Sequence, residues 1–178
     1  RTAQGVRLTP AGHVAMQHAM RLSQGFDLFG GELAEYAQGY RGHVRLWANM
    51  SALTEFLPEV LGQFMLAHPD IKVEVEERLS GEITRALVEG LADIGVFAEG
   101  TPVDGLTLRP FQTDELVLIC ARGHALAARK RVKFQEALAY PFVGLSRGSS
   151  LLDLATGQAQ AAGLPLRLRV QVSSFGAM

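Results

Sequence analysis

Hydroxyl side chains stand directly after several predicted strands of this chain, each at a point where a helix is expected to begin. These residues are Ser51, Thr54, Ser80, Ser146, Ser149, Ser173 and Ser174. In open α/β sheets, ligands collect at the carboxyl ends of strands, where free N–H groups and the dipole of the following helix favour anions. The pattern therefore predicts a small-molecule cleft that suits a carboxylate, although a sugar or another neutral metabolite would suit the same hydroxyl groups.

The alternative is that each serine only caps a helix, which stabilises that helix by about 1 kcal/mol. For any single serine, we favour this interpretation. Ser80 in particular is expected to be the N-cap of a helix that ends at Gly90.

Other reactive residue types do not form a catalytic or metal-binding pattern. Cys120 is the only cysteine and ends an apolar stretch, where a free cysteine is usually inert core. Together with His124 it provides too few ligands for zinc. No glycine-rich phosphate loop, nucleophile elbow or paired acid and base supports an α/β enzyme. We therefore expect no catalytic residue, no metal and no cofactor, and we expect Asp93 to bond local backbone groups.

The composition is that of an ordinary soluble globular protein. Hydrophobic residues make up 48% and charged residues 20% of the 178 residues, and the formal net charge is −1. The whole chain therefore carries no electrostatic signature of nucleic-acid binding. No apolar run reaches the about 18 residues of a membrane helix, and no signal peptide is recognisable. Together with the single cysteine, these observations predict a cytoplasmic protein that does not enter a membrane.

The elements that must position the hydroxyl groups alternate in an α/β order. Strands are expected at 43–50, 71–75, 93–97, 106–112, 115–121, 141–145 and 166–172. Helices are expected at 51–67, 80–90, 132–139 and 149–162, with Pro58 beginning the main part of the first one. This order predicts parallel sheets covered by helices on both faces, and a turn-rich break at 99–105 is a candidate hinge.

The segment before the first strand predicts a long helix with a narrow apolar seam. Thr9 is expected as its N-cap and Pro10 as its first residue. Apolar residues then recur alternately four and three positions apart, as in a coiled coil: Ala15, Ala19, Leu22, Phe26, Phe29, Leu33, Tyr36 and Tyr40. We interpret this seam as a dimerisation surface; the alternative is a helix that packs on its own domain. The glycines at 30 and 31 predict a kink.

Short motifs follow one another in a specific order along the chain. They are Gly5–Gly12 (GVRLTPAG), His68-Pro69-Asp70, Leu79-Ser80-Gly81, Gly90-Leu91, Asp93-Ile94-Gly95 and Cys120–Ala127 (CARGHALA). In this order they resemble the LysR-type transcriptional regulators over essentially the whole chain. The first motif is similar to the end of the family's winged helix-turn-helix and the start of its linker helix.

This resemblance implies an α/β fold in which an N-terminal linker helix precedes two α/β subdomains like those of periplasmic binding proteins, the second incomplete at the C-terminus. The implied boundaries are 1–9 for the end of the DNA-binding wing, 10–41 for the linker helix, 42–98 for the first subdomain and 99–178 for the second. The rest of the DNA-binding domain and a return segment are expected outside this chain. A homo-oligomer, a dimer or tetramer, is implied, with contacts through Ala19, Leu22, Phe26, Phe29 and Leu33.

The resemblance also implies a regulator that senses a small effector between the subdomains and transmits the signal through the oligomer to promoter DNA. The residues expected to contact the effector are Ser51, Ala52, Thr54, Ser80, Phe97, Ser146, Ser149, Ser173 and Ser174. Arg1 and Arg7 would lie near DNA, where contacts to phosphates position a protein without reading sequence. The alternative function is a stand-alone solute-binding domain of the periplasmic type. The missing signal peptide and the heptad helix argue against it.

Overall fold

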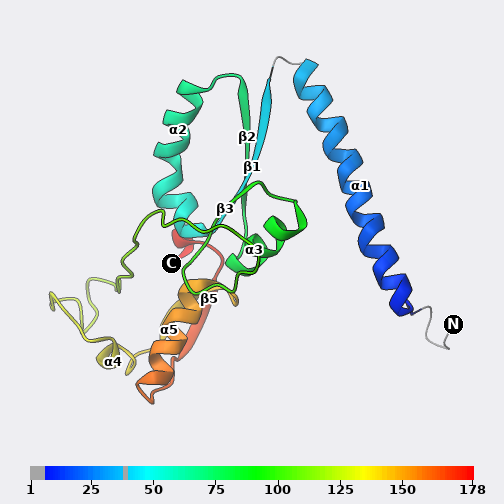
Figure 1. The fold of residues 1–178 in the computed structure, drawn as a ribbon. Coiled ribbons are helices and arrows are strands. Elements are labelled where there is room, and N and C mark those ends of the chain that lie inside the picture. Colours follow the sequence, from blue (N-terminus) through cyan, green and yellow to red (C-terminus); the bar gives the residue numbers. More distant parts are fainter. Residues whose placement is uncertain (1–6, 38–39) are drawn as a thin grey trace.

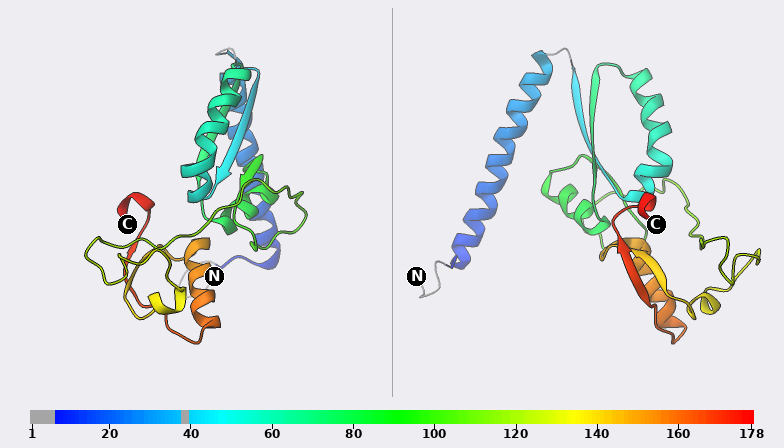
Figure 2. Two further views of the ribbon diagram at one scale, coloured as in Figure 1. Left: turned by 90° about the vertical axis from the view of Figure 1, so that its left-hand side faces the viewer. Right: turned by 180° about the vertical axis from the view of Figure 1, so that it is seen from behind.

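The computed structural model describes residues 7–37 and 40–178, so Arg1 lies outside the described residues. A long N-terminal helix, α1 (Pro10–Ala37), stands beside the α/β part of the molecule and approaches it only near the start of the first strand (Figures 1 and 2). Thr9 is its N-cap as predicted, because the Thr9 Oγ1 accepts a hydrogen bond from the Gly12 N–H at 3.0 Å. None of the described helices is long and apolar enough to cross a membrane.

The kink predicted at Gly30 and Gly31 is absent. The helical assignment continues through both residues, and the ribbon shows no sharp bend there. A glycine lowers helix propensity but keeps its backbone N–H, so it weakens the hydrogen-bonded ladder without interrupting it.

The first α/β unit is a parallel sheet with the strand order β2-β1-β3. Its strands are β1 (Gly42–Ala48), β2 (Ile71–Glu77) and β3 (Ile94–Val96). Its helices are the π-helical turn η1 (Ala52–Phe56), α2 (Leu57–Ala67) and α3 (Ser80–Glu89). The predicted parallel order is thus confirmed. Helix α2 begins at Leu57, one residue before the predicted start, and Pro58 lies in its first turn.

The core of this unit lies between β1 and the turn that follows it. Leu46, Ala48, Ala52 and Leu57 are buried there, with Val73 and Val75 of β2 packed against them. On α3, Ile83 is fully buried, and a Cβ at Gly95 would lie 2.5 Å from its Cγ2 atom. Gly95 therefore permits the close approach of α3 to β3. Ile94, predicted to lie in a buried strand, is 51% exposed.

Asp93 links β1 to β3 through its carboxylate. The Arg45 N–H donates to its Oδ2 at 2.8 Å, and the Arg45 guanidinium donates from Nε at 3.1 Å and from Nη2 to Oδ1 at 2.7 Å. Hydrogen bonding from the Arg45 side chain, more than any other cause, lowers the pKa of Asp93. Asp93 does bond a backbone N–H, but its partner is not local as predicted: Arg45 lies 48 residues away in the sequence, and its guanidinium adds an ion pair.

The second α/β unit is smaller. It contains α4 (Phe134–Ala137), β4 (Phe142–Leu145), α5 (Ser150–Ala161), β5 (Leu168–Val172) and a final 3-10 turn, η2 (Phe175–Ala177). Its two strands pair in parallel, as predicted. Gly163 follows the C-cap of α5, and its φ of +67° is the left-handed conformation that glycine adopts without strain.

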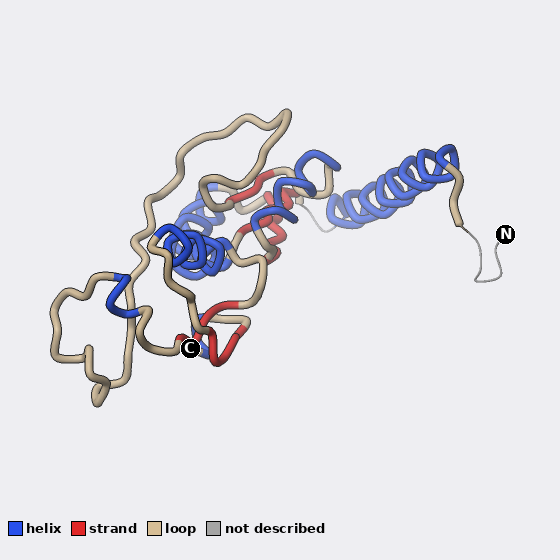
Figure 3. Tube along the Cα trace, turned by 90° about the horizontal axis from the view of Figure 1, so that it is seen from below, coloured by secondary structure: helices blue, strands red, loops and turns tan. Residues whose placement is uncertain are grey.

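The strands predicted at 106–112 and 115–121 are wrong. This part of the chain is an irregular loop, visible as the long open excursion in Figure 3. Alternating apolar residues form a strand only where a neighbour completes the ladder, and no strand of the described residues pairs with this segment. The apolar run from Leu116 to Ile119 is consequently exposed, and so is Cys120, which was expected in the core.

Candidate functional site

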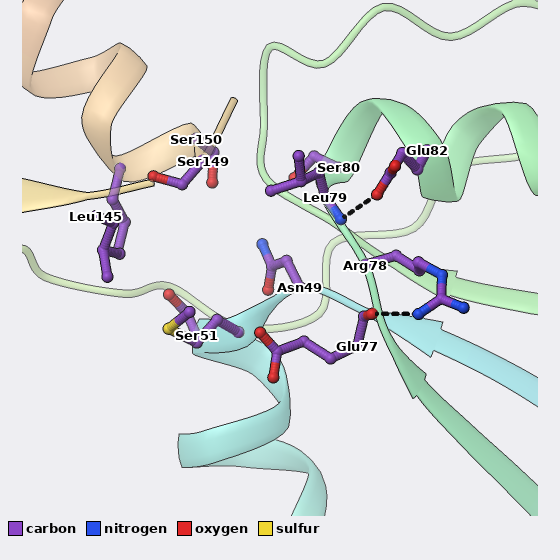
Figure 4. Close-up of a pocket in the computed structure, with 12 residues that line it drawn as sticks. Asn49, Ser51, Glu77, Arg78, Leu79, Ser80, Glu82, Leu145, Ser149 and Ser150 are labelled. Carbon is purple, nitrogen blue, oxygen red and sulfur yellow. Dashed lines mark hydrogen bonds between the residues drawn. The ribbon is translucent and has the colours of Figure 1, made fainter. Parts of the chain in front are cut away.

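A cavity of about 380 Å³ lies where the carboxyl ends of β1 and β2 face the start of α5 (Figure 4). It is therefore built from both α/β units. Its lining residues are Asn49, Met50, Ser51, Glu77, Arg78, Leu79, Ser80, Glu82, Leu145, Ser149, Ser150 and Leu151. The position agrees with the general rule that ligands of open α/β sheets bind beyond the carboxyl ends of strands.

Asn49 organises the turn after β1, and the sequence reasoning missed it. The Ala52 N–H donates to the Asn49 Oδ1 at 3.0 Å. This bond fixes the orientation of the amide, because the opposite orientation would place a donor against a donor. The Asn49 Nδ2 therefore points across the cavity toward the side where Leu79 and Ser149 lie. The strong preference of Asn for helix starts was the signal that could have found it.

Ser51 lines the cavity as predicted, but it does not cap the helix that follows. It already has helical backbone angles and makes no capping hydrogen bond. Its hydroxyl group is therefore not committed to the start of η1.

The prediction that Ser80 is the N-cap of α3 is wrong. Leu79 occupies the N-cap position with an extended ψ of 146°, and the Glu82 carboxylate accepts a hydrogen bond from its N–H at 3.0 Å. Ser80 is instead the first helical residue, 6% exposed, and its Oγ accepts a hydrogen bond from the Ala98 N–H at 3.3 Å. Helix α3 begins one residue earlier than expected, and the Ser80 hydroxyl links it to the segment after β3.

Ser149 is the N-cap of α5 as predicted, because its Oγ accepts a hydrogen bond from the Leu152 N–H at 3.2 Å. The preceding Gly148 has a φ of +83°, and a Cβ there would lie 3.0 Å from the Leu79 Cδ1. The loop before α5 thus packs directly against the loop before α3. This contact closes one side of the cavity between the two units.

The remaining residues expected to contact an effector lie away from this cavity. Ala52 is buried in the core, Thr54 is exposed on η1, and Phe97 is half-buried after β3. Ser146 donates from Oγ to the Val172 carbonyl oxygen at 3.1 Å and so connects β4 to β5. Two further residues, Ser173 and Ser174, are exposed beyond β5. Their contact with an effector stays a prediction, as does that of the three serines at the cavity.

The charged side chains that line the cavity differ in whether they already form hydrogen bonds or ion pairs. The Arg78 guanidinium forms an ion pair with Glu76, donates to the Glu77 carbonyl oxygen at 2.9 Å, and lies 5.0 Å from the centre of the Trp47 ring. The Glu82 carboxylate is bonded to the start of α3. The Glu77 carboxylate extends toward Ser51 and meets no hydrogen-bond or ion-pair partner among residues 7–37 and 40–178.

No group of three or more His, Cys, Asp or Glu side chains in the described part of the chain could hold a metal ion. The cavity itself offers hydroxyl groups, an amide and one unengaged carboxylate. These groups are suited to binding a small polar molecule by hydrogen bonds.

Comparison with known proteins identifies relatives along nearly the whole chain. A family model described as the LysR substrate binding domain matches residues 37–178. The uncharacterized HTH-type transcriptional regulator YbhD of Escherichia coli is 29% identical over 154 residues, which cover 85% of this chain and 49% of YbhD. The chain spans about half the length of the curated relatives it matches.

Solved structures share the fold. The effector binding domain of QuiR in complex with shikimate superposes with a TM-score of 0.66 at 21% identity, covering 77% of this chain and 66% of that one. Full-length CbnR complexed with its target DNA superposes with a TM-score of 0.61 at 22% identity, covering 98% of this chain and 62% of CbnR.

Proposed function

The chain belongs to the family of LysR-type transcriptional regulators through its LysR substrate binding domain, and from this premise we propose that it is the effector-sensing part of a DNA-binding regulator. The observation that carries the proposal is the cavity between the two units, at the carboxyl ends of β1 and β2. The effector is a small metabolite, and a carboxylate suits the hydroxyl groups and the start of α5. The QuiR domain, with the same fold, binds shikimate, which is a hydroxylated carboxylate.

In this proposal the two units are the regulatory subdomains 42–98 and 99–178, and the effector contacts both of them. A ligand held between Ser51 on one side and Ser149 on the other would favour one relative arrangement of the subdomains. Binding shifts that equilibrium only as far as the effector's affinity differs between the two arrangements. Catalysis is not part of this mechanism, and the relatives are named as regulators.

The signal would leave the sensor through α1, the linker helix. Leu22, Phe26, Phe29 and Leu33 are 56–74% exposed and follow the heptad spacing. Ala19 lies on the same seam and is also exposed. Apolar side chains that repeat in this way on a helix are buried by a second helix in a coiled coil. We therefore propose that two copies pair along α1 in the cytoplasm and that Arg7, next to this helix, lies near DNA in the whole protein.

The test uses the full-length native protein and the DNA upstream of its own gene. Binding is measured by fluorescence anisotropy with and without added metabolites, over a series of salt concentrations. We expect binding that weakens as salt rises, because contacts to phosphates release counterions, and that changes when an effector is present. A protein that binds no promoter fragment and instead turns over a substrate would contradict the proposal.

A further inference from the structure

Two sides of the cavity offer opposite hydrogen-bonding chemistry. We propose that the ligand carries a hydrogen-bond donor, a hydroxyl or an ammonium group, that meets the Glu77 carboxylate, and an acceptor that meets Asn49 and Ser149. Glu77 is then the residue that selects among small acids. The inference rests on the proposed function, since it assigns the chemistry of the molecule that the same cavity would hold.

The donor side consists of groups whose acceptor atoms are already used. The Asn49 Oδ1 is bonded to the Ala52 N–H, which leaves the Asn49 Nδ2 as a donor directed across the cavity. The Ser149 Oγ already accepts from the Leu152 N–H, so its O–H group is available to donate. A ligand carboxylate or carbonyl oxygen fits this side because it only accepts hydrogen bonds.

The acceptor side is Glu77. An ionised carboxylate accepts hydrogen bonds and donates none, and bonds between a charged acceptor and a donor are shorter and stronger than neutral ones. The adjacent cation does not neutralise Glu77, because the Arg78 guanidinium is paired with Glu76 and packs over Trp47. The Glu77 side chain reaches the cavity next to Ser51. A ligand whose oxygens were all anionic would therefore be repelled on this side, whereas an ammonium or hydroxyl group would be attracted.

The experiment uses acids that differ only in the group offered to Glu77. Aspartate, malate and succinate share two carboxylates and carry an ammonium, a hydroxyl or a hydrogen at the second carbon. Shikimate and cyclohex-1-ene-1-carboxylate form a second pair, with and without ring hydroxyls. Dissociation constants for the full-length regulator are measured by isothermal titration calorimetry. We expect at least one donor-bearing acid to bind about tenfold or more tightly than its counterpart that lacks the donor.

The variant Glu77→Gln distinguishes a ligand that offers a hydroxyl group from one that offers an ammonium group. It keeps an acceptor oxygen for a hydroxyl group but loses the charge that attracts an ammonium group. We expect the preference for aspartate over succinate to disappear, or the preference for a hydroxylated acid to fall several-fold, while the melting temperature stays unchanged. Glu59→Gln, an exposed carboxylate on α2 outside the cavity lining, is the matched control and should leave every dissociation constant unchanged.

The outcomes that overturn the inference differ from those that overturn the proposed function. If succinate and cyclohexene carboxylate bind as tightly as their donor-bearing counterparts, or if Glu77→Gln alters no preference, the role of Glu77 is refuted while the cavity remains an effector site. If none of the five acids binds at millimolar concentration, both the assigned ligand chemistry and the small-acid effector site are refuted.

Discussion

Replacing Asp93 by asparagine tests how much one ion pair contributes to the stability of the first α/β unit. The carboxylate accepts one hydrogen bond from the Arg45 backbone N–H and two from its guanidinium. An asparagine in the same place keeps one acceptor oxygen but loses the charge and the second acceptor. A hydrogen bond to a charged group contributes about 1.5–3 kcal/mol when it is well buried. The Asp93 side chain is 43% exposed, so solvent screening reduces the expected loss on Asp93→Asn to about 1 kcal/mol.

The pH dependence of this loss follows from the lowered pKa of Asp93. Because Arg45 stabilises the charged form, the folded-state pKa lies below the value of the unfolded chain, 3.8. The contribution to stability is therefore fully present above that value and disappears as the pH falls through the folded-state pKa. Asp93→Asn does not titrate at this position, so the difference between the two proteins should be constant near neutral pH and shrink below about pH 4.

The assay is urea denaturation followed by circular dichroism at a series of pH values from neutral to 3. Asp104→Asn, which removes an exposed carboxylate in the loop after β3, is the matched control and should change the free energy of unfolding by no more than a few tenths of a kcal/mol. A difference between wild type and Asp93→Asn that is as large at pH 3 as at pH 7, or that equals the control at every pH, would refute the reasoning.

Three further predictions concern the seam, the packing of α3 and the cavity. Leu22→Asp should raise the dimer dissociation constant at least about tenfold in light scattering, because a charge replaces an apolar residue of the seam. Met20→Asp, which changes an exposed residue off the seam, is the control and should leave it unchanged. Equal masses for the wild type and both variants would contradict dimerisation through the seam. Gly95→Ala should lower the free energy of unfolding by about 1–3 kcal/mol in thermal melts, since its Cβ would lie 2.5 Å from Ile83, and an unchanged melting temperature would contradict this packing. Ser51→Ala should raise the dissociation constant of the tightest-binding acid about three- to tenfold in calorimetry. An unchanged dissociation constant would show that Ser51 does not contact the ligand.

Helix starts and ends were predictable from the sequence where the interacting groups lie within a few residues of one another. Thr9 and Ser149 each supply a side-chain oxygen to an N–H three residues later, so the helix starts follow from sequence neighbours. The left-handed φ of Gly90 that ends α3 follows in the same way from the preference of glycine. The alternation in 71–75 predicted a strand, and β1 was present to pair with it.

Two predictions failed because the outcome depended on distant residues. The segment 115–121 has the composition of a strand, yet no described strand completes its ladder, and its apolar residues are exposed. Ser80 has the residue type of an N-cap, but its hydroxyl bonds to the Ala98 N–H, 18 residues away. Leu79 takes the N-cap position instead, and its N–H donates to the Glu82 carboxylate. In both cases a contact that is remote in the sequence, present or absent, decided the local structure.

The sequence by itself determined the family, the alternation of strands and helices, and the positions of hydroxyl groups at strand ends. Tertiary structure decided which of these groups meet. Ser51 and Ser149 are nearly a hundred residues apart, and they line one cavity because two separate sheets present their strand ends to each other. It also decided that the Arg78 guanidinium packs over Trp47 of β1, while the Glu77 carboxylate faces the cavity. The physical reason is that hydrogen bonds and charges act over a few ångströms in space, so their partners are fixed by the packing of the two units rather than by distance along the chain.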